Sequence, residues 1–236
     1  MTASSVSGIP VEWFDYRYFY GRKGVGYYTC GLAREAAAVV IRKRSPGMLS
    51  DPMWLRSLPT FKNNPFIVGF LVEQACLSFI SCTGFHHGSA NWGPLKATIF
   101  EGDLISAIPP GDCEIFFIPQ APNFKDIDAL YLRVHHLDEI VLVIPIQITI
   151  AKAHKDSEAA FYSRWSDWEK RFAGYEVITT FVWIVENKRS WEAVDEVFRE
   201  TRKTLKQISP AHQRLFIMVA DTFPDLGLQL AMIRQM

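Results

Sequence analysis

The chain has 236 residues, enough for one large domain or two small ones, and 49% of them are hydrophobic against 21% charged. This balance supplies ample material for a core and excludes a charge-rich disordered chain. The 25 basic and 25 acidic residues cancel to a net charge of zero. A zero balance argues against a dedicated high-affinity DNA binder, although local basic groups remain at 42–44 and 199–206.

The cysteines and the most apolar stretches favour an intracellular protein. The four cysteines are far apart and form no CxxC pair, which argues against a zinc ribbon and favours buried thiols in a reducing compartment. Cys76 and Cys82, in one apolar segment, are expected to pack in the core. Residues 1–20 lack a secretion pattern, and the stretches 66–80 and 140–150 are too short to span a membrane.

Residues 1–64 are expected to form an irregular, aromatic-rich extension packed on the core. The segment 11–20 is dense in Tyr and Phe, and a short helix is predicted over 33–44. Prolines interrupt the stretch that follows. The glycine-rich segment 21–26 predicts a turn rather than a phosphate-binding loop, because it lacks the required spacing and a following Lys-Ser/Thr.

A sharper pattern begins at Pro65. Residues 65–81 predict a buried helix that is apolar nearly all round, with Pro65 in its first turn and Gly84 after its end. Glu73 is the only charged residue of this helix. A carboxylate in the middle of a buried helix must pair, bind a metal or face a cleft, so Glu73 is a candidate site residue.

Residues 65–236 are expected to form one α/β domain with three layers, in which helices flank a mixed central sheet. Ser190 is a candidate N-cap for the second long helix. The remaining elements follow from residue type and periodicity. Strands are predicted over 95–100, 114–118, 128–134, 140–150, 176–185 and 214–220, and helices over 156–172 and 190–207.

Two of these strands carry polar residues in an otherwise apolar context. Asp128 begins one strand, and Gln147 and Thr149 interrupt the next, two positions apart and therefore on one face. A buried amide is costly unless something hydrogen-bonds to it. Neighbouring strands that bring these side chains together make an oxygen-rich site, as a hard divalent cation requires.

The order and spacing of these residues resemble the PD-(D/E)xK nuclease superfamily. The resemblance rests on Glu73 in the helix, on Asp126-Ile-Asp-Ala, and on Ile146-Gln-Ile-Thr-Ile-Ala-Lys-Ala-His154. It is closest to the nuclease-like domains of Crinkler effectors and retrotransposon-hot-spot-type proteins, and it covers roughly 65–220. It implies a restriction-endonuclease-like core of a helix, three meandering strands, a helix and a strand.

The resemblance also implies a site and an activity. Glu73, Asp128 and Gln147 would bind Mg²⁺ or Mn²⁺ for metal-dependent hydrolysis of phosphodiesters, in DNA rather than RNA. Two positions depart from the family pattern: Gln147 replaces a carboxylate, and Thr149 stands where a lysine usually assists the attacking water. Lys152 reaches the site only if the strand bends, because it lies on the opposite face of a straight strand. His154 is a candidate base or phosphate ligand.

Each residue also has an ordinary structural explanation. Glu73 pairs within a packed interface, Asp128 begins a strand, Gln147 and Thr149 form a hydrogen-bonded patch, and His154 lies on the surface. The alternative is therefore a degenerate nuclease fold that binds a protein or nucleic acid without cleaving it. The resemblance implies a nuclear location, otherwise a cytoplasmic one. No GxxxxGK[ST] motif is present, so an NTPase, if required, is expected from another chain.

Overall fold

The computed structural model describes residues 19–22, 25–28, 55, 58–63, 65–88, 90–101, 105, 108–120, 126–150, 157–205 and 210–235. Internal contacts divide the chain into two compact units, Met1–Ser45 and Pro46–Met236. In the first unit, β1 (Phe19–Arg22) and β2 (Val25–Tyr28) pair antiparallel, so the glycine-rich segment belongs to a hairpin. The helix predicted over 33–44 lies outside the described residues.

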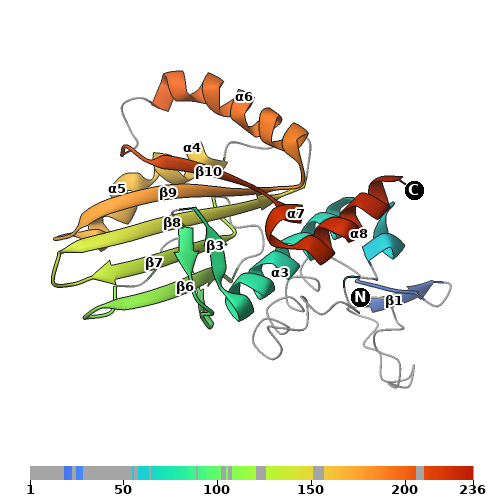
Figure 1. Cartoon of the computed structure of the whole chain (residues 1–236), viewed down its shortest axis with the longest axis horizontal. Coiled ribbons are helices and arrows are strands. Elements are labelled where there is room, and N and C mark those ends of the chain that lie inside the picture. Colours follow the sequence, from blue (N-terminus) through green and yellow to red (C-terminus); the bar gives the residue numbers. More distant parts are fainter. Residues whose placement is uncertain are drawn as a thin grey trace. The chain divides into compact units, whose positions relative to one another are not determined.

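The second unit contains a six-stranded mixed sheet in the order β10-β9-β8-β7-β6-β5 (Figure 1). This confirms an α/β class with a mixed sheet and helices. Its strands are β5 (Ala97–Phe100), β6 (Cys113–Pro119), β7 (Ala129–His135), β8 (Ile140–Thr149), β9 (Glu176–Val185) and β10 (Gln213–Met218). Its helices are η4 (Leu58–Phe61), α3 (Pro65–Thr83), α4 (Ser157–Ser163), α5 (Trp165–Glu169), η5 (Lys170–Phe172), α6 (Lys188–Leu205), α7 (Val219–Thr222) and α8 (Pro224–Gln235).

The direction of each strand follows from the length of its connection. Strands β6, β7 and β8 form an antiparallel meander, and a short turn joins β7 to β8. Strand β8 is parallel to β9, and β9 is parallel to β10, because α4 with α5, and then α6, carry the chain back across the sheet. At the other edge β5 pairs parallel with β6.

Apolar side chains cover both faces of the sheet. On β8, Ile144, Ile146 and Ile148 pack into one cluster with α3 and α8. The alternate residues Val141 and Val143 pack into a second cluster with α4, α5 and η5. Figure 1 shows α4, α5 and α6 together on one side of the sheet. We call this side the α4–α6 face and the opposite side the α3 face; the core is thus divided between the two.

Helix α3 is apolar because its side chains pack in one buried cluster with the sheet, η4, α7 and α8. It runs from Pro65 to Thr83, two residues beyond the predicted end. Gly84 follows with φ of 82°, a left-handed conformation that glycine adopts without strain, and it donates to the Ile80 carbonyl at 2.9 Å. Cys76 is buried as expected. Cys82 is exposed, so its expected burial is wrong.

Several predicted boundaries shift for local reasons. The helix expected over 156–172 is divided at Arg164, which has φ −102° and ψ 13°. Helix α6 begins at Lys188 rather than after Ser190, because the Asn187 side chain accepts a bond from the Ser190 N–H at 3.1 Å. Strand β10 ends at Met218, where α7 begins.

Several elements were not predicted. Strands β3 (Phe85–His87) and β4 (Ala90–Trp92) form a small antiparallel hairpin, and each is too short to show a period. Helix α8 has a weak apolar stripe along its sequence, so it was expected only as a closing segment. Among the described residues, no helix combines the length and the hydrophobicity needed to cross a membrane.

Candidate active site

Asp128 and Gln147 form the centre of the candidate site, where β7 begins opposite the end of β8. The Gln147 Nε2 donates to Asp128 Oδ2 at 2.7 Å, and the Ile148 backbone N–H donates to the same oxygen at 2.6 Å. The Asp128 N–H in turn donates to the Ile146 carbonyl at 2.8 Å. The antiparallel register therefore brings together two residues that are 19 positions apart in the sequence.

The chain bends at Asp128. Ile127 packs in the cluster on the α4–α6 face, whereas Ala129, two residues later, packs in the cluster on the α3 face. Residues two apart in a straight strand lie on one face, so regular alternation stops here. The Asp128 carboxylate lies just before β7, where it accepts bonds from the end of the neighbouring strand β8.

Glu73 lies in the middle of α3. Its Oε1 accepts a bond from the adjacent Gln74 Nε2 at 2.8 Å, and its side chain is only partly buried. Burial raises the pKa of the Cys76 thiol, one helical turn along α3, and the charges of Glu73 and then Asp128 raise it further. The Cys76 thiol is thus exposed to the charge of the helix acid and of the strand acid.

Thr149 lies on the same face of β8 as Gln147, as predicted from their spacing. Gln147 is in register with Trp183 of β9, and Thr149 with Val185. The Thr149 side chain is buried, at 4% exposure, and its carbonyl accepts the Glu186 N–H at 3.2 Å. Thr149 has no ionisable group to assist a water molecule. The other two predicted residues, Lys152 and His154, lie outside the described residues.

The donor atoms at this edge suit a hard cation. Glu73 and Asp128 supply carboxylate oxygens, and the Gln147 amide supplies a neutral oxygen, because its nitrogen faces Asp128. Mg²⁺ and Mn²⁺ prefer oxygen ligands of these types. Within the described part of the chain, no group of three His, Cys, Asp or Glu side chains is placed to hold a metal. The three residues thus fit a divalent cation in donor type, with two negative charges rather than three.

A buried polar network on the α4–α6 face was missed from the sequence. Glu158 of α4 is fully buried and accepts bonds from Trp183 Nε1 at 3.0 Å and Arg214 Nε at 2.8 Å. His212 Nε2 lies 2.6 Å from its other oxygen, and Arg214 also binds Asp195 at 2.9 Å. The network joins α4, β9, β10 and α6 beside the row that contains Gln147.

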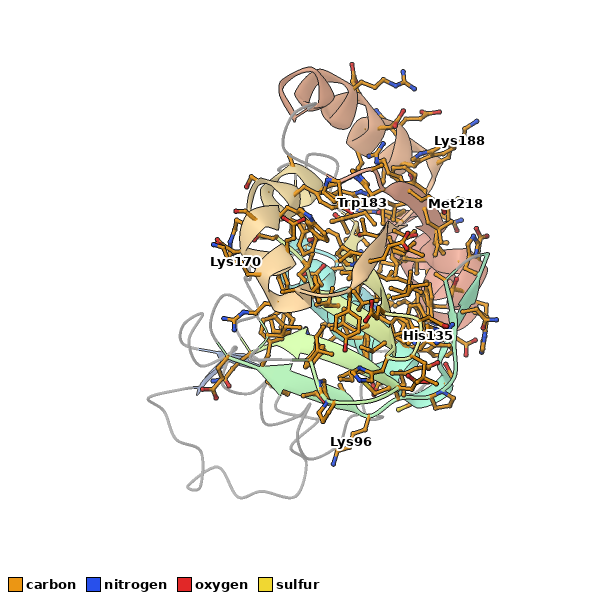
Figure 2. All side chains as sticks on the ribbon, turned by 90° about the vertical axis from the view of Figure 1, so that its left-hand side faces the viewer. Lys96, His135, Lys170, Trp183, Lys188 and Met218 are labelled. Atoms are coloured by element: carbon orange, nitrogen blue, oxygen red, sulfur yellow. The ribbon has the colours of Figure 1, made fainter. Side chains whose placement is uncertain are left out.

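The aromatic side chains around this network are packed tightly. The Tyr162 ring stacks on His212 with centroids 4.0 Å apart, and its hydroxyl lies 3.0 Å from Thr179 Oγ1. Burial raises the pKa of Tyr162 well above its usual range, and the hydrogen bond to Thr179 opposes that rise. In Figure 2 the labelled Trp183 lies among packed side chains, whereas Lys170 and Lys188 lie at the periphery. Trp165, Trp168 and Trp183 are core residues.

Two arginine ion pairs anchor segments next to the candidate site. Arg234 of α8 binds both oxygens of Glu186, at 2.8 and 2.7 Å, just past the end of β9. Its Nη2 is also 3.4 Å from the Ile150 carbonyl, which directly follows β8. Arg164 Nη1 binds Asp126 Oδ2 at 2.8 Å, two residues before Asp128. Neither pair was predicted, because the partners are far apart in the sequence.

Comparison with known proteins gives no relative: no family model, no curated protein and no solved structure matches this chain.

Proposed function

We propose that the chain is a metal-dependent nuclease of the PD-(D/E)xK type that hydrolyses phosphodiester bonds, with DNA as the preferred substrate. The observation that carries the proposal is the contact between Asp128 and Gln147 where two central strands of the mixed sheet, β7 and β8, begin and end. The order of elements supports it: α3, then the β6–β7–β8 meander, then α4 with α5, then β9, as expected of a restriction-endonuclease-like core.

Each residue has a distinct part in this proposal. Glu73 and Asp128 hold a Mg²⁺ or Mn²⁺ ion by their carboxylates, and Gln147 adds its amide oxygen while its nitrogen orients Asp128. When bound, such an ion lowers the pKa of a coordinated water and neutralises charge on the phosphate. The Ile148 N–H donates to Asp128 Oδ2 at 2.6 Å and holds the carboxylate in its position.

A second candidate function is binding of nucleic acid or protein without cleavage. Two observations favour it. Thr149 replaces the assisting lysine and is buried, and Asp128 Oδ2 already accepts two hydrogen bonds within the protein. A site with two carboxylates also attracts a cation less strongly than a site with three. In this case the edge of β8 remains as part of a binding surface, and the catalytic step is lost.

Cleavage of supercoiled plasmid in Mg²⁺ or Mn²⁺ tests the proposal. We compare the parent protein with Asp128→Asn, which removes the charge but keeps a hydrogen-bond acceptor of similar size. Asp138→Asn is the matched control, because Asp138 lies in the exposed turn at the far end of β7. We expect nicking by the parent and the control and a loss of at least about a hundredfold in Asp128→Asn. Equal nicking by all three would indicate a contaminating nuclease; binding of DNA without nicking would establish the second candidate.

A further inference from the structure

Arg164 is a partly exposed cation that a buried carboxylate holds in place next to the candidate site. Its Nη1 lies 2.8 Å from Asp126 Oδ2, and the Asp126 side chain is 4% exposed against 29% for Arg164. A buried carboxylate is costly unless it is paired, so Asp126 constrains the guanidinium strongly. The outcome is an arginine with a fixed position and access to solvent, at the junction of α4 and α5.

The position of Arg164 is set by the short segment before β7. Asp126 precedes Asp128 by two residues, so their Cα atoms are at most about 7 Å apart. The Asp128 backbone is fixed by its bond to the Ile146 carbonyl at 2.8 Å, which also limits movement of this segment. Phosphates on one strand of DNA advance by ~3.4 Å along the axis per nucleotide. Arg164 is therefore within a few nucleotide steps of a phosphate bound at Asp128.

The negative charges of the candidate site favour a nearby cation that binds phosphate. Glu73 and Asp128 repel an approaching polyanion until a metal is bound, so a cation beside Asp128 would favour its binding. Arginine suits phosphate because its planar group presents several donors, so one edge binds a carboxylate while another faces a ligand.

We propose that Arg164, positioned by Asp126, contacts a phosphate of the nucleic-acid backbone within a few nucleotides of the one at Asp128. This inference rests on the proposed function and extends it by one substrate-binding residue. The alternative role is purely structural: the ion pair ties the α4–α5 junction to the start of β7. The two roles differ in their response to salt, because only a phosphate contact releases counterions from the nucleic acid.

The chain offers a close control for this test. Arg133 of β7 also binds one carboxylate, Glu114, at 2.9 Å, and it is 30% exposed, almost the same as Arg164. It lies five residues along the strand from Asp128, a distance of about 16 Å. The two arginines match in exposure and differ in their distance from the candidate site; Arg133 also donates to Tyr131 Oη at 3.0 Å and to the Asn91 carbonyl at 2.9 Å.

The experiment measures the dissociation constant of a labelled DNA duplex, in Ca²⁺ in place of Mg²⁺, between 50 and 200 mM salt. Replacement of Arg164 alone leaves a buried charge on Asp126 and risks unfolding. We therefore use the double variant Asp126→Asn/Arg164→Gln, with Glu114→Gln/Arg133→Gln as its control and circular dichroism to verify the fold. Loss of one phosphate contact lowers the slope of log affinity against log salt by about 0.9. Over this range the salt effect on affinity should therefore shrink about 3.5-fold.

The outcomes separate this inference from the proposed function. A lower slope in the Arg164 double variant, with parental behaviour in the control, supports the phosphate contact whether or not the protein cleaves DNA. An unchanged slope in a folded variant overturns the contact and leaves the nuclease proposal standing if the parent cleaves plasmid. Absence of DNA binding by the parent overturns both. The variant Arg164→Lys keeps the charge, so we expect it to retain the parental slope.

Discussion

Replacement of Glu158 by alanine should destabilise the fold more than any exposed charge removal. Glu158 is fully buried and is bonded to Trp183 at 3.0 Å, to His212 at 2.6 Å and to Arg214 at 2.8 Å. The alanine variant removes one carboxylate from the partly buried Arg214 charge and leaves its bond to Asp195. Removal of one partner from a buried ion pair costs about 3–5 kcal/mol, and we expect a loss in this range.

Urea unfolding followed by tryptophan fluorescence measures this loss, since Trp183 itself belongs to the network. For a domain of this size the expected loss corresponds to a fall in Tm of about 6–20 °C. Asp167→Asn is the control: Asp167 pairs with Lys170 at 3.0 Å, but both side chains are largely exposed. The control should change the free energy of unfolding by less than about 1 kcal/mol. If Glu158→Ala lowers the free energy of unfolding no more than Asp167→Asn does, the stabilising role of the network is refuted.

Three further predictions follow from other contacts. Gln147→Glu should lower the free energy of unfolding in metal-free buffer by about 1–3 kcal/mol, because it replaces the 2.7 Å hydrogen bond to Asp128 with two like charges. Mn²⁺ should reverse this loss. Thermal melting with and without Mn²⁺ tests both expectations. Folding holds the pKa of Cys76 above 9.0 and raises that of Tyr131 from 10.0 to about 12, mainly through burial. As the pH rises, the unfolded chain therefore releases these two protons before the folded chain does, and the free energy of unfolding falls. Urea unfolding at pH 8, 10 and 11 should show a fall above pH ~9 of up to about 1.4 kcal/mol per pH unit for each group. A free energy of unfolding that does not change with pH would contradict this. Gly84→Ala should lower the free energy of unfolding by at least about 1 kcal/mol, because φ is 82° and a Cβ would clash with nearby backbone; unchanged melting would contradict it.

The sheet was predictable where its residues are β-branched or aromatic and continuous. Strand β9 has the predicted bounds, Glu176–Val185, because its apolar run is bounded by a turn on one side and by Glu186 and Asn187 on the other. Strand β8 ends within one residue of its prediction for the same reason. Helix α8 was not predicted because its sequence lacks a clear apolar stripe. The β3–β4 hairpin was not predicted because its strands are too short to show a period.

The candidate site was predictable to the extent that it depends on a hairpin. Asp128 and Gln147 belong to consecutive strands, so a register that pairs Ala129 with Ile146 brings them together. The Glu158 network depends instead on crossovers that bring residues 25, 54 and 56 positions away into contact with one carboxylate. No local period indicates such contacts. The bend at Asp128 was also missed, because alternation along a strand assumes regular backbone.

The central claim is that Glu73 and Asp128, with Gln147, hold one divalent cation. Calorimetric titration of Mn²⁺ into the parent protein, Glu73→Gln and Asp128→Asn tests it most directly, with Asp138→Asn as the control. We predict one site in the parent and in the control, and affinity at least about tenfold weaker in each of the other two variants. Equal Mn²⁺ affinity in all four proteins, or no binding by the parent, would contradict the claim.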